Sequence, residues 1–346
     1  MKIVICSGGT GGHMFPACAL FAAARKEGHG VSMVTDSRGE IFCADISPKI
    51  VLNTVRFSHK KIFSIMLDFA STFLKFFRLW RRGSPDVIVG FGGILTVIPP
   101  LVGKIFGSKV VIYEQNSVVG KANKFLEKFA DLKLSTFELG NEWMKIAAPV
   151  RTEFCKWVLP YRCDGKINIL VLGGSQGAVS FAKIIPEALS LVDVRKRKSI
   201  EITQQVGKND LEKLRNFYGN IGIKSTLEEF IRNVAEVMAK AQLVICRSGA
   251  STLSELAMLG RPAILIPYPN SSRDHQLHNA IYYKNKKAAW VLEEKDGIAL
   301  ELAEIIQKVL QNRELLKSAA YNMMKSSTDR AANDFVKLIE KVHLEG

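Results

Sequence analysis

Paired cysteines are absent from this sequence. Its six cysteines are scattered along 346 residues, and no two of them form a C-x-x-C motif. A chain of this length can bury a sizeable hydrophobic core, so it does not need disulfide bonds to fold. We therefore expect a reducing compartment, and the spacing offers no cysteine cluster for zinc.

Long uninterrupted apolar runs are also missing. The run at residues 3–6 is followed at once by Ser7, Gly8 and Gly9, which leaves no room for the apolar core of a secretory signal, about 7 to 15 residues. The longest uncharged stretch, 87–103, is broken by glycines and prolines, whereas a bilayer-spanning helix needs about 20 apolar residues. We expect neither a signal peptide nor a transmembrane helix.

Acidic residues are too few to balance the basic ones. The chain has 48 Lys and Arg against 33 Asp and Glu, a formal net charge of +15. This excess favours anionic partners such as phosphates, acidic lipid or nucleic acid. No nucleic-acid-binding module is visible, and phosphate-binding loops explain the charge better, so we expect no nucleic-acid partner.

Short β-branched segments alternate with longer helical patterns, which indicates parallel sheets. The segments lie near residues 4, 33, 88, 111, 170, 245 and 264. Two of them end in similar glycine loops, which predicts an α/β protein with two Rossmann-like domains whose parallel sheets face each other across a cleft. We expect an N-terminal domain over 1–157, a C-terminal domain over 158–328, and a C-terminal helix at about 329–346 that packs back on the first domain.

The first glycine loop, GGTGGH at 8–13, follows a predicted strand and precedes a helical pattern. Backbone N–H groups at such a helix N-terminus bind phosphate or a developing oxyanion, although a plain strand-to-helix turn also uses glycines. The loop lacks the third glycine of G-x-G-x-x-G and the ending of a P-loop, which disfavours nucleoside triphosphatase chemistry. Asp36 could hold a ribose diol, as in a nicotinamide-dependent oxidoreductase, or cap a turn.

His13 lies at the end of this loop. The positive end of the helix dipole favours a neutral imidazole, which can accept a proton in catalysis. The alternative is a histidine that only hydrogen-bonds a nearby backbone carbonyl.

A second candidate site follows the strand that ends at Cys246. The residues after it, RSGASTLSE, open a helix with small hydroxylated side chains, an arrangement that suits a diphosphate. Glu255 can accept hydrogen bonds from the two hydroxyls of a ribose, or it can simply complement the helix dipole. Gln276 could bind sugar hydroxyls. Asp274, His275 and His278 are too few for a zinc site, so we expect no metal.

The segment Ile62–Trp80 is mostly apolar and has one narrow polar stripe and basic residues at both ends. This pattern predicts a helix that lies in a headgroup layer rich in acidic lipid, or a helix buried against the sheet. In the first case the membrane or acceptor-lipid contacts are Phe69, Phe73, Phe76, Phe77, Trp80, Arg81 and Arg82.

Several motifs together resemble the GT-B family of glycosyltransferases that convert lipid I to lipid II in peptidoglycan synthesis. The motifs are GGTGGH at 8–13, YEQNSVVGKAN from Tyr113, PVR from Pro149, LGGSQGA from Leu172, CRSGASTLSE from Cys246 and DHQLHNA from Asp274. The resemblance covers nearly the whole chain.

The resemblance implies an inverting transfer of N-acetylglucosamine from UDP-N-acetylglucosamine to the 4-hydroxyl of lipid I, without cofactor or metal. It implies a peripheral enzyme on the cytoplasmic face of the bacterial inner membrane, with cell-wall synthesis and division proteins as further partners. His13 is the leading candidate base or a contact to the acceptor diphosphate, and Glu114 is the second candidate base. The implied donor contacts are Thr10, Gly11, Gly12, Asn116, Arg151, Ser175, Ile231, Ala250, Ser251, Thr252, Leu253, Ser254, Glu255 and Gln276.

One loop departs from the family pattern. Where the family has a tyrosine after paired glycines and then Gly-Pro-Gly, this chain reads GGILTVIPP at 92–100. The departure predicts relaxed acceptor recognition or a reduced rate. The competing functions are another GT-B transferase that acts on a different glycolipid, a nicotinamide oxidoreductase, and a non-catalytic membrane-docking protein.

Overall fold

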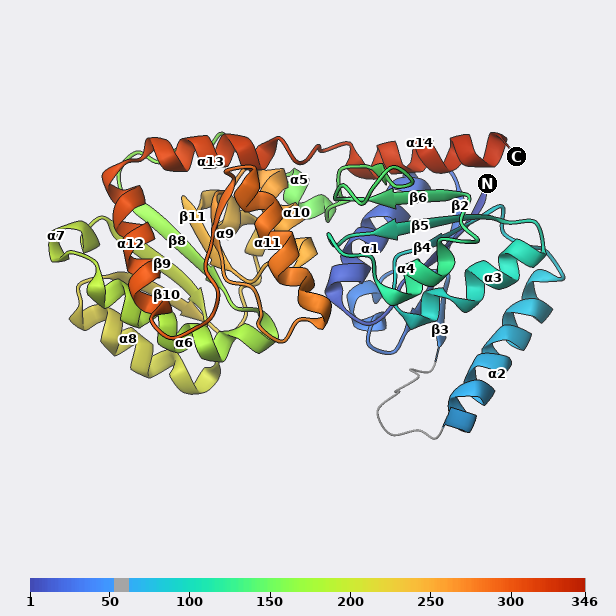
Figure 1. Ribbon diagram of the computed structural model, residues 1–346, viewed down its shortest axis with the longest axis horizontal. Coiled ribbons are helices and arrows are strands. Elements are labelled where there is room, and N and C mark those ends of the chain that lie inside the picture. The colour runs from blue at the N-terminus through green and yellow to red at the C-terminus, as the bar shows by residue number, and fades with distance from the viewer. Residues whose placement is uncertain (53–61, 346) are drawn as a thin grey trace. The chain divides into compact units, whose positions relative to one another are not determined.

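The computed structural model describes residues 1–52 and 62–345, except for the side chains of 62–67, 95, 174–178 and 272. The chain forms two compact units (Figure 1): unit 1 comprises Met1–Arg151 and Asp329–Gly346, and unit 2 comprises Thr152–Thr328. The first boundary precedes residue 157 because the short helix α5 (Thr152–Cys155) packs against α9 (Val234–Lys240) and α10 (Ala250–Leu259) of unit 2.

Unit 1 is built on a seven-stranded parallel sheet in the order β3-β2-β1-β4-β5-β6-β7. Its strands are β1 (Lys2–Cys6), β2 (Gly30–Asp36), β3 (Lys49–Leu52), β4 (Val87–Gly90), β5 (Lys109–Glu114), β6 (Leu132–Ser135) and β7 (Met144–Lys145). Its helices are α1 (Gly11–Lys26), η1 (Glu40–Cys43), α2 (Ile62–Trp80), η2 (Ile94–Thr96), α3 (Ile98–Ile105), α4 (Lys121–Leu126) and α14 (Ala331–Leu344).

Helices cover both faces of this sheet, because alternate residues of its strands point to opposite sides. Ile3 and Ile5 of β1 pack in one cluster with α1 and α14, whereas Val4 and Cys6 pack in another with α2 and α3. The C-terminal helix α14 belongs to the first cluster. The ring of Phe335 lies in the core, among buried residues of β4 and β5.

Unit 2 contains a six-stranded parallel sheet in the order β10-β9-β8-β11-β12-β13. Its strands are β8 (Ile167–Leu172), β9 (Ile200–Gln205), β10 (Lys224–Glu228), β11 (Leu243–Cys246), β12 (Ala263–Leu265) and β13 (Ala289–Val291). Its remaining helices are α6 (Gly174–Leu191), α7 (Val194–Arg197), η3 (Lys208–Asp210), α8 (Leu211–Asn220), α9 (Val234–Lys240), α10 (Ala250–Leu259), η4 (Ser272–Asp274), α11 (His275–Asn285), α12 (Ile298–Gln311) and α13 (Glu314–Met324).

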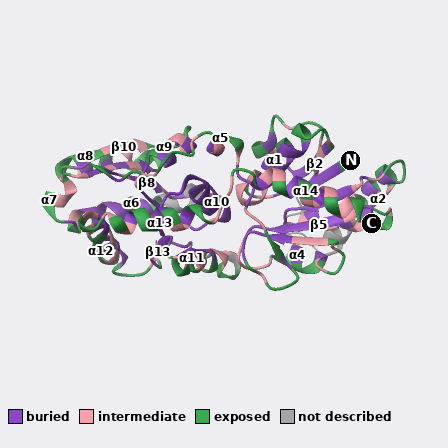
Figure 2. Cartoon of the chain, turned by 90° about the horizontal axis from the view of Figure 1, so that it is seen from above, coloured by how far each residue is buried: buried purple, intermediate pink, exposed green. Residues whose placement is uncertain are grey.

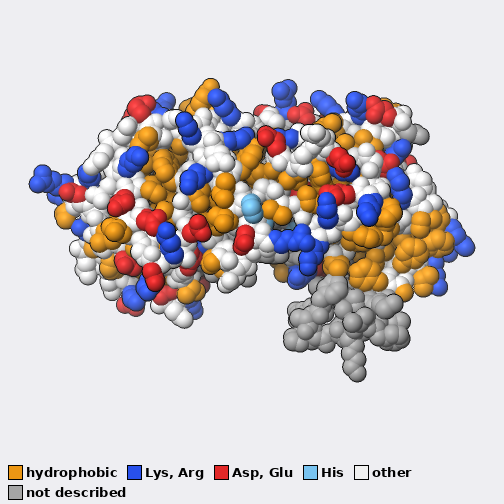
Figure 3. Space-filling model, viewed as in Figure 1, with side chains coloured by type: hydrophobic (Ala, Val, Ile, Leu, Met, Phe, Trp, Pro, Cys, Tyr) orange, Lys and Arg blue, Asp and Glu red, His pale blue; other side chains and the backbone are white. Residues whose placement is uncertain are grey.

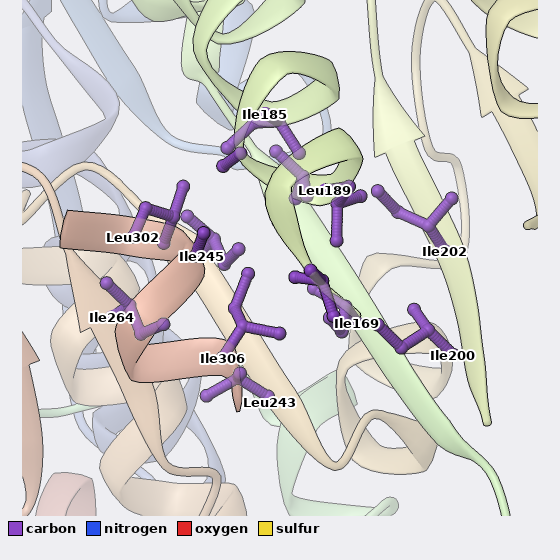
Figure 4. Close-up of a cluster of buried hydrophobic side chains, with 14 of the residues drawn as sticks. Ile169, Ile185, Leu189, Ile200, Ile202, Leu243, Ile245, Ile264, Leu302 and Ile306 are labelled. Atoms are coloured by element: carbon purple, nitrogen blue, oxygen red, sulfur yellow. The ribbon is translucent and has the colours of Figure 1, made fainter. Parts of the chain in front are cut away.

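Aliphatic side chains fill the main core of unit 2. Ile169, Ile202 and Ile245 of the sheet meet Leu189 of α6 and Leu302 of α12, all of them at most 2% exposed (Figure 4). Figure 2 shows the strands and inner helix faces of each unit as buried and the connecting loops as largely exposed. The predicted α/β fold class and all seven expected strands are confirmed.

Both sheets reverse their strand order at an interior position, between β1 and β4 in unit 1 and between β8 and β11 in unit 2. At such a point the loops at the carboxyl ends of the two central strands run in opposite directions and leave room for a ligand. The glycine loops after β1 and β4, and the start of α10 after β11, all lie at these two points.

Candidate active site

The loop after β1 leads to an open helix end in unit 1. Thr10, the residue before α1, has an extended backbone and makes no side-chain cap. The N–H groups of His13 and Met14 both donate to the Thr10 carbonyl at 3.1 Å. The amides of Gly11 and Gly12 therefore precede the first hydrogen bonds of the helix, where the dipole and the N–H groups favour an anion.

A cavity of about 190 Å³ adjoins this helix end. This volume is below the roughly 300 to 1,000 Å³ of a pocket for a whole ligand, so it suits one group of a substrate. The loop over 92–100 reaches the cavity in spite of its unusual sequence. The lining residues come from the loop after β1, the loop after β4 and the end of β2: Gly8, Gly9, Thr10, His13, Asp36, Arg38, Gly93 and Ile94.

Asp36 holds the first glycine loop in place. Its Oδ1 accepts hydrogen bonds from the N–H groups of Gly9 (3.1 Å) and Gly39 (2.7 Å), and its Oδ2 accepts from the Arg38 guanidinium at 2.9 and 3.1 Å. Burial by itself would raise the pKa of this fully buried carboxyl, but these donors outweigh burial and hold the pKa below its usual value. Of the two roles considered, the turn-capping role fits this geometry, because both oxygens are already engaged.

His13 is half-buried in the cavity wall. Its Nδ1 lies 3.3 Å from the hydroxyl oxygen of Thr10, and its ring lies against Gly92. Gly92 has a φ of +87°, and a Cβ there would come within 3.1 Å of both Cδ2 and Nε2 of the imidazole. The loop after β4 therefore approaches the ring as closely as only a glycine allows.

Glu114, the second candidate base, acts as the anchor of the loop after β5. It is 2% exposed, and its two oxygens accept four hydrogen bonds, from the backbone and side chain of Asn116 and from Gly120 and Asn123. Burial raises the pKa of Glu114, and the four donors oppose that rise without cancelling it. The arrangement fixes Asn116, one of the expected donor contacts, beside Glu114.

Arg151, the last residue of unit 1 before the second unit begins, lies over an aromatic ring. Its guanidinium carbon is 4.3 Å from the centroid of Phe15 on α1, and a Cβ on Gly11 would clash with the same ring. Phe15 thus connects Arg151 to the start of α1, so the expected contacts Gly11 and Arg151 lie close together in unit 1.

The start of α10 in unit 2 also lacks a side-chain cap, like the start of α1. Gly249 precedes the helix without a side-chain cap, and the N–H of Leu253 is the first to bond back to the Gly249 carbonyl. The amides of residues 250–252 are therefore left for an anion. Glu255 follows in the second turn and is 6% exposed.

Not every residue of this helix start can use its side chain. Ser251 and Thr252 are half-buried, whereas Leu253 is a core residue and the Ser254 hydroxyl donates to the Ala250 carbonyl at 2.9 Å. A contact from Ala250 to a ligand would therefore be made by its backbone amide, whereas the N–H of Leu253 and the hydroxyl of Ser254 already donate within the helix.

Gln276 is fixed at the start of α11 beside this helix. Its Oε1 accepts a hydrogen bond from the N–H of Tyr268 at 3.0 Å, and its backbone carbonyl accepts one from the Ser248 hydroxyl at 2.7 Å. This leaves the amide nitrogen of Gln276 as the group that can donate to a ligand. Ile231 is buried in the loop between β10 and α9, and the side chain of Ser175 lies outside the described residues.

Arg247 lies next to this helix start and was not selected by the sequence analysis. It stands between β11 and the α10 start, and its side chain is only 11% exposed and forms an ion pair with Glu294. The motif CRSGASTLSE contains Arg247. Its side-chain partners follow β12 and β13 or lie on α6, far away in the sequence, so no local pattern could indicate its role.

The helix α2 has the bounds predicted from its pattern, but its aromatic residues divide between surface and core. Phe76 and Trp80 are 0% and 5% exposed and lie in the cluster against the sheet. Phe69, Phe73 and Phe77 are partly buried against the same cluster. The structure therefore corrects the expectation that all five rings face lipid: Phe76 and Trp80 are part of the core.

The exposed side of α2 carries apolar and basic side chains together. Leu74 and Leu79 are 49% and 45% exposed, and Arg81 and Arg82 are exposed at the end of the helix. Figure 3 shows hydrophobic side chains gathered over the region of α2 and α3. A groove of about 880 Å³ runs between this side and β3, lined by Lys49, Ile50, Val51, Ser71, Leu74, Lys75, Arg78, Leu79 and Arg82.

Across residues 1–52 and 62–345, no helix combines the length and apolar character that a membrane crossing requires. Within the same residues no three His, Cys, Asp or Glu side chains gather into a group that could hold a metal ion.

Comparison with known proteins gives concordant results. Family models described as the glycosyltransferase family 28 N-terminal and C-terminal domains match residues 3–134 and 168–341. A UDP-N-acetylglucosamine–N-acetylmuramyl-(pentapeptide) pyrophosphoryl-undecaprenol N-acetylglucosamine transferase of Rhodospirillum rubrum is 34% identical over 92% of this chain and 86% of its own length. A protein of the same name from Wolbachia pipientis subsp. Culex pipiens is 31% identical over 98% of both chains.

A solved structure is similar over the whole chain. The crystal structure of Acinetobacter baumannii MurG has a TM-score of 0.83 at 26% identity and covers 99% of this chain and 100% of that one. The predicted GT-B fold and family are thereby confirmed. The chain belongs to glycosyltransferase family 28 and, within it, to the N-acetylglucosaminyltransferases of peptidoglycan synthesis.

Proposed function

We propose that the chain transfers N-acetylglucosamine from UDP-N-acetylglucosamine to the 4-hydroxyl of lipid I. The observation that carries this proposal is the start of α10, where open backbone amides lie one turn before the buried carboxyl of Glu255. The amides suit a diphosphate, and a carboxylate at that distance suits the ribose of the same nucleotide. The relatives named above carry this reaction in their names.

Unit 2 would hold the donor. The amides of residues 250–252 would take up the negative charge that develops on the diphosphate as the sugar leaves, and Glu255 would accept hydrogen bonds from the ribose hydroxyls. Gln276 would donate from its amide nitrogen to a sugar hydroxyl. Ile231, buried in the loop between β10 and α9, is the further residue of this unit expected to contact the donor.

Unit 1 would bind the acceptor. The acceptor oxygen forms a bond to the anomeric carbon while the bond from that carbon to the β-phosphate oxygen breaks, which inverts the configuration. His13 would accept the proton of the attacking hydroxyl, because its ring lines the cavity beside the amides of Gly11 and Gly12. Glu114 is less suited to this role because four hydrogen bonds already occupy its oxygens, so it would orient Asn116 instead.

A donor-binding experiment tests this proposal. Glu255→Ala should raise the KM for UDP-N-acetylglucosamine, since the lost partner of a buried hydroxyl costs about 1 to 3 kcal/mol. Glu314→Ala is a suitable control, because Glu314 lies in unit 2 with a side chain 75% exposed. An unchanged KM would remove Glu255 from the donor site.

The choice of acceptor tests the reaction itself, because product should form only with a lipid I analogue. Turnover with other glycolipids but not with lipid I would support a different GT-B transferase.

The exposed side of α2 supports a further proposal, peripheral attachment to an anionic membrane. Leu74 and Leu79 would enter the headgroup layer, and Lys75, Arg78 and Arg82 would attract acidic lipid.

Substitutions on that surface test the attachment. Leu74→Ser with Leu79→Ser should release the protein from vesicles that contain phosphatidylglycerol, while thermal stability and activity on a water-soluble acceptor stay near wild type. Retention of the variant on the vesicles would contradict this attachment surface.

A further inference from the structure

Arg247 joins four segments of unit 2 through its guanidinium. Nη1 donates to the carbonyls of Ile266 (3.2 Å) and Pro267 (3.3 Å), which follow β12. Nη2 donates to the hydroxyl of Ser180 on α6 at 2.7 Å. A single side chain thus ties the end of β11 to the end of β12 and to α6.

The same guanidinium is paired and stacked. Nη1 lies 2.6 Å from a carboxylate oxygen of Glu294, which follows β13. The guanidinium carbon is 4.6 Å from the centroid of the Phe181 ring and 5.5 Å from that of Tyr268. Contacts of this kind require a planar, delocalised cation with several donors, which lysine does not provide.

Two connections lead from Arg247 to Gln276, one through hydrogen bonds of its guanidinium and one along the backbone to Ser248. In the first, Arg247 donates hydrogen bonds to the carbonyls of Ile266 and Pro267. The next residue, Tyr268, donates its N–H to Oε1 of Gln276. In the second, Ser248 follows Arg247 directly and donates its hydroxyl to the Gln276 carbonyl. Asn279 closes this second connection by donating to the Ser248 carbonyl at 3.2 Å.

From these contacts we infer that Arg247 is a positioning residue that sets the place of the Gln276 amide relative to the start of α10. The inference rests on the proposed function, in which α10 binds the diphosphate and Gln276 binds the sugar. Arg247 does not itself touch the donor in this scheme. It determines whether the sugar-binding amide and the diphosphate-binding amides fit one UDP-sugar at the same time.

UDP-N-acetylglucosamine and UDP, which lacks the N-acetylglucosamine, distinguish the contribution of Gln276 from that of the α10 amides. Arg247→Lys keeps the positive charge but loses the forked contacts, so the Gln276 amide shifts while the α10 amides remain. The affinity for UDP-N-acetylglucosamine should fall about tenfold, the loss expected for one hydrogen bond, and the affinity for UDP should stay within about threefold. Titration calorimetry with each ligand on wild type and variant measures both values.

Two further variants separate positioning from general destabilisation. Arg261 is also a buried arginine of unit 2, 1% exposed, and it donates to the Leu159 carbonyl at 2.9 Å, away from Gln276. Arg261→Lys should leave the ratio of the two affinities unchanged even if it lowers the melting temperature. Arg247→Lys in a Gln276→Ala background should cause little additional loss, because the group that Arg247 positions is already absent.

Equal losses for UDP and UDP-N-acetylglucosamine in Arg247→Lys, or no loss for either, would overturn the positioning role. Additive losses in the double variant would overturn it as well. Failure of the wild-type protein to bind UDP-N-acetylglucosamine would instead refute the proposed function, so the two failures are distinguishable.

Discussion

The imidazole of His13 lies where a side chain on Gly92 would have to begin, although the two residues belong to different loops of unit 1. An added Cβ on Gly92 would come within 3.1 Å of the imidazole, and the backbone at Gly92 has a φ of +87°. This close approach joins the loop after β4 to the loop after β1, at the point where the strand order of the sheet reverses. The position of the candidate base therefore depends on a glycine that is distant in sequence.

Substitution of Gly92 by alanine should displace the His13 ring. We expect kcat to fall by about 10- to 100-fold, because a small misplacement of a catalytic group has effects of that order. Gly107→Ala is the matched control: Gly107 has a φ of +85° but no neighbour within 4 Å of its added Cβ. Both variants should lose about 1 to 2 kcal/mol of stability from backbone strain. Equal kcat values for the two variants would contradict the link to His13.

Removal of the imidazole tests the base directly. His13→Ala should lower kcat by about 10² to 10⁴ with a smaller effect on the donor KM, as expected for a lost proton acceptor. His29→Ala is a useful comparison, because His29 is also a histidine of unit 1 but pairs with Glu340 of α14 at 3.0 Å. A kcat for His13→Ala equal to that of His29→Ala would leave His13 with a structural role only.

Asp36 makes the stability of unit 1 depend on pH. Its folded pKa lies below the usual value, so its carboxylate stabilises the fold above the unfolded pKa of about 3.9, and this stability is lost as the pH falls through the folded pKa. Asp36→Asn should lower the free energy of unfolding at pH 7 by about 1 to 3 kcal/mol. The difference from wild type should shrink below about pH 4. Denaturant unfolding at both pH values measures it, with the exposed Asp45→Asn as control. A constant difference across this pH range would exclude the Asp36 carboxylate as its source.

Periodicity predicted those parts of the fold that depend on local sequence. The buried β-branched runs near 4, 88 and 245 became strands, and the 62–80 pattern became a helix with those bounds, because apolar spacing decides such elements. The strands β3, β6, β7, β9, β10 and β13 were not predicted. Two of them, β9 and β10, have the sequences IEITQQ and KSTLE, in which polar and charged residues interrupt the apolar pattern, since these strands lie at or next to the edge of the sheet.

The site was predictable only where a motif lies at one helix end. The motif after Cys246 indicated the open start of α10, and the first loop indicated the open start of α1. The roles of Asp36, Glu114 and Arg247 could be recognised only in the folded structure. Their hydrogen-bond partners lie on other elements, or come close only because of the way the loop folds. Sequence patterns show which residue types are present but not which hydrogen bonds they make.

The aromatic residues of α2 divide between the core and the surface of unit 1. Phe76 is fully buried between α2 and the sheet, and its ring centroid lies 4.9 Å from that of Trp80. Phe76→Ala should therefore destabilise unit 1 by about 3 to 5 kcal/mol, the usual cost of a cavity left by a phenylalanine. Leu74→Ala on the exposed side should change stability by less than about 0.5 kcal/mol. Denaturant unfolding of both variants measures these values, and a stability loss for Phe76→Ala as small as that for Leu74→Ala would mean that Phe76 does not support the core.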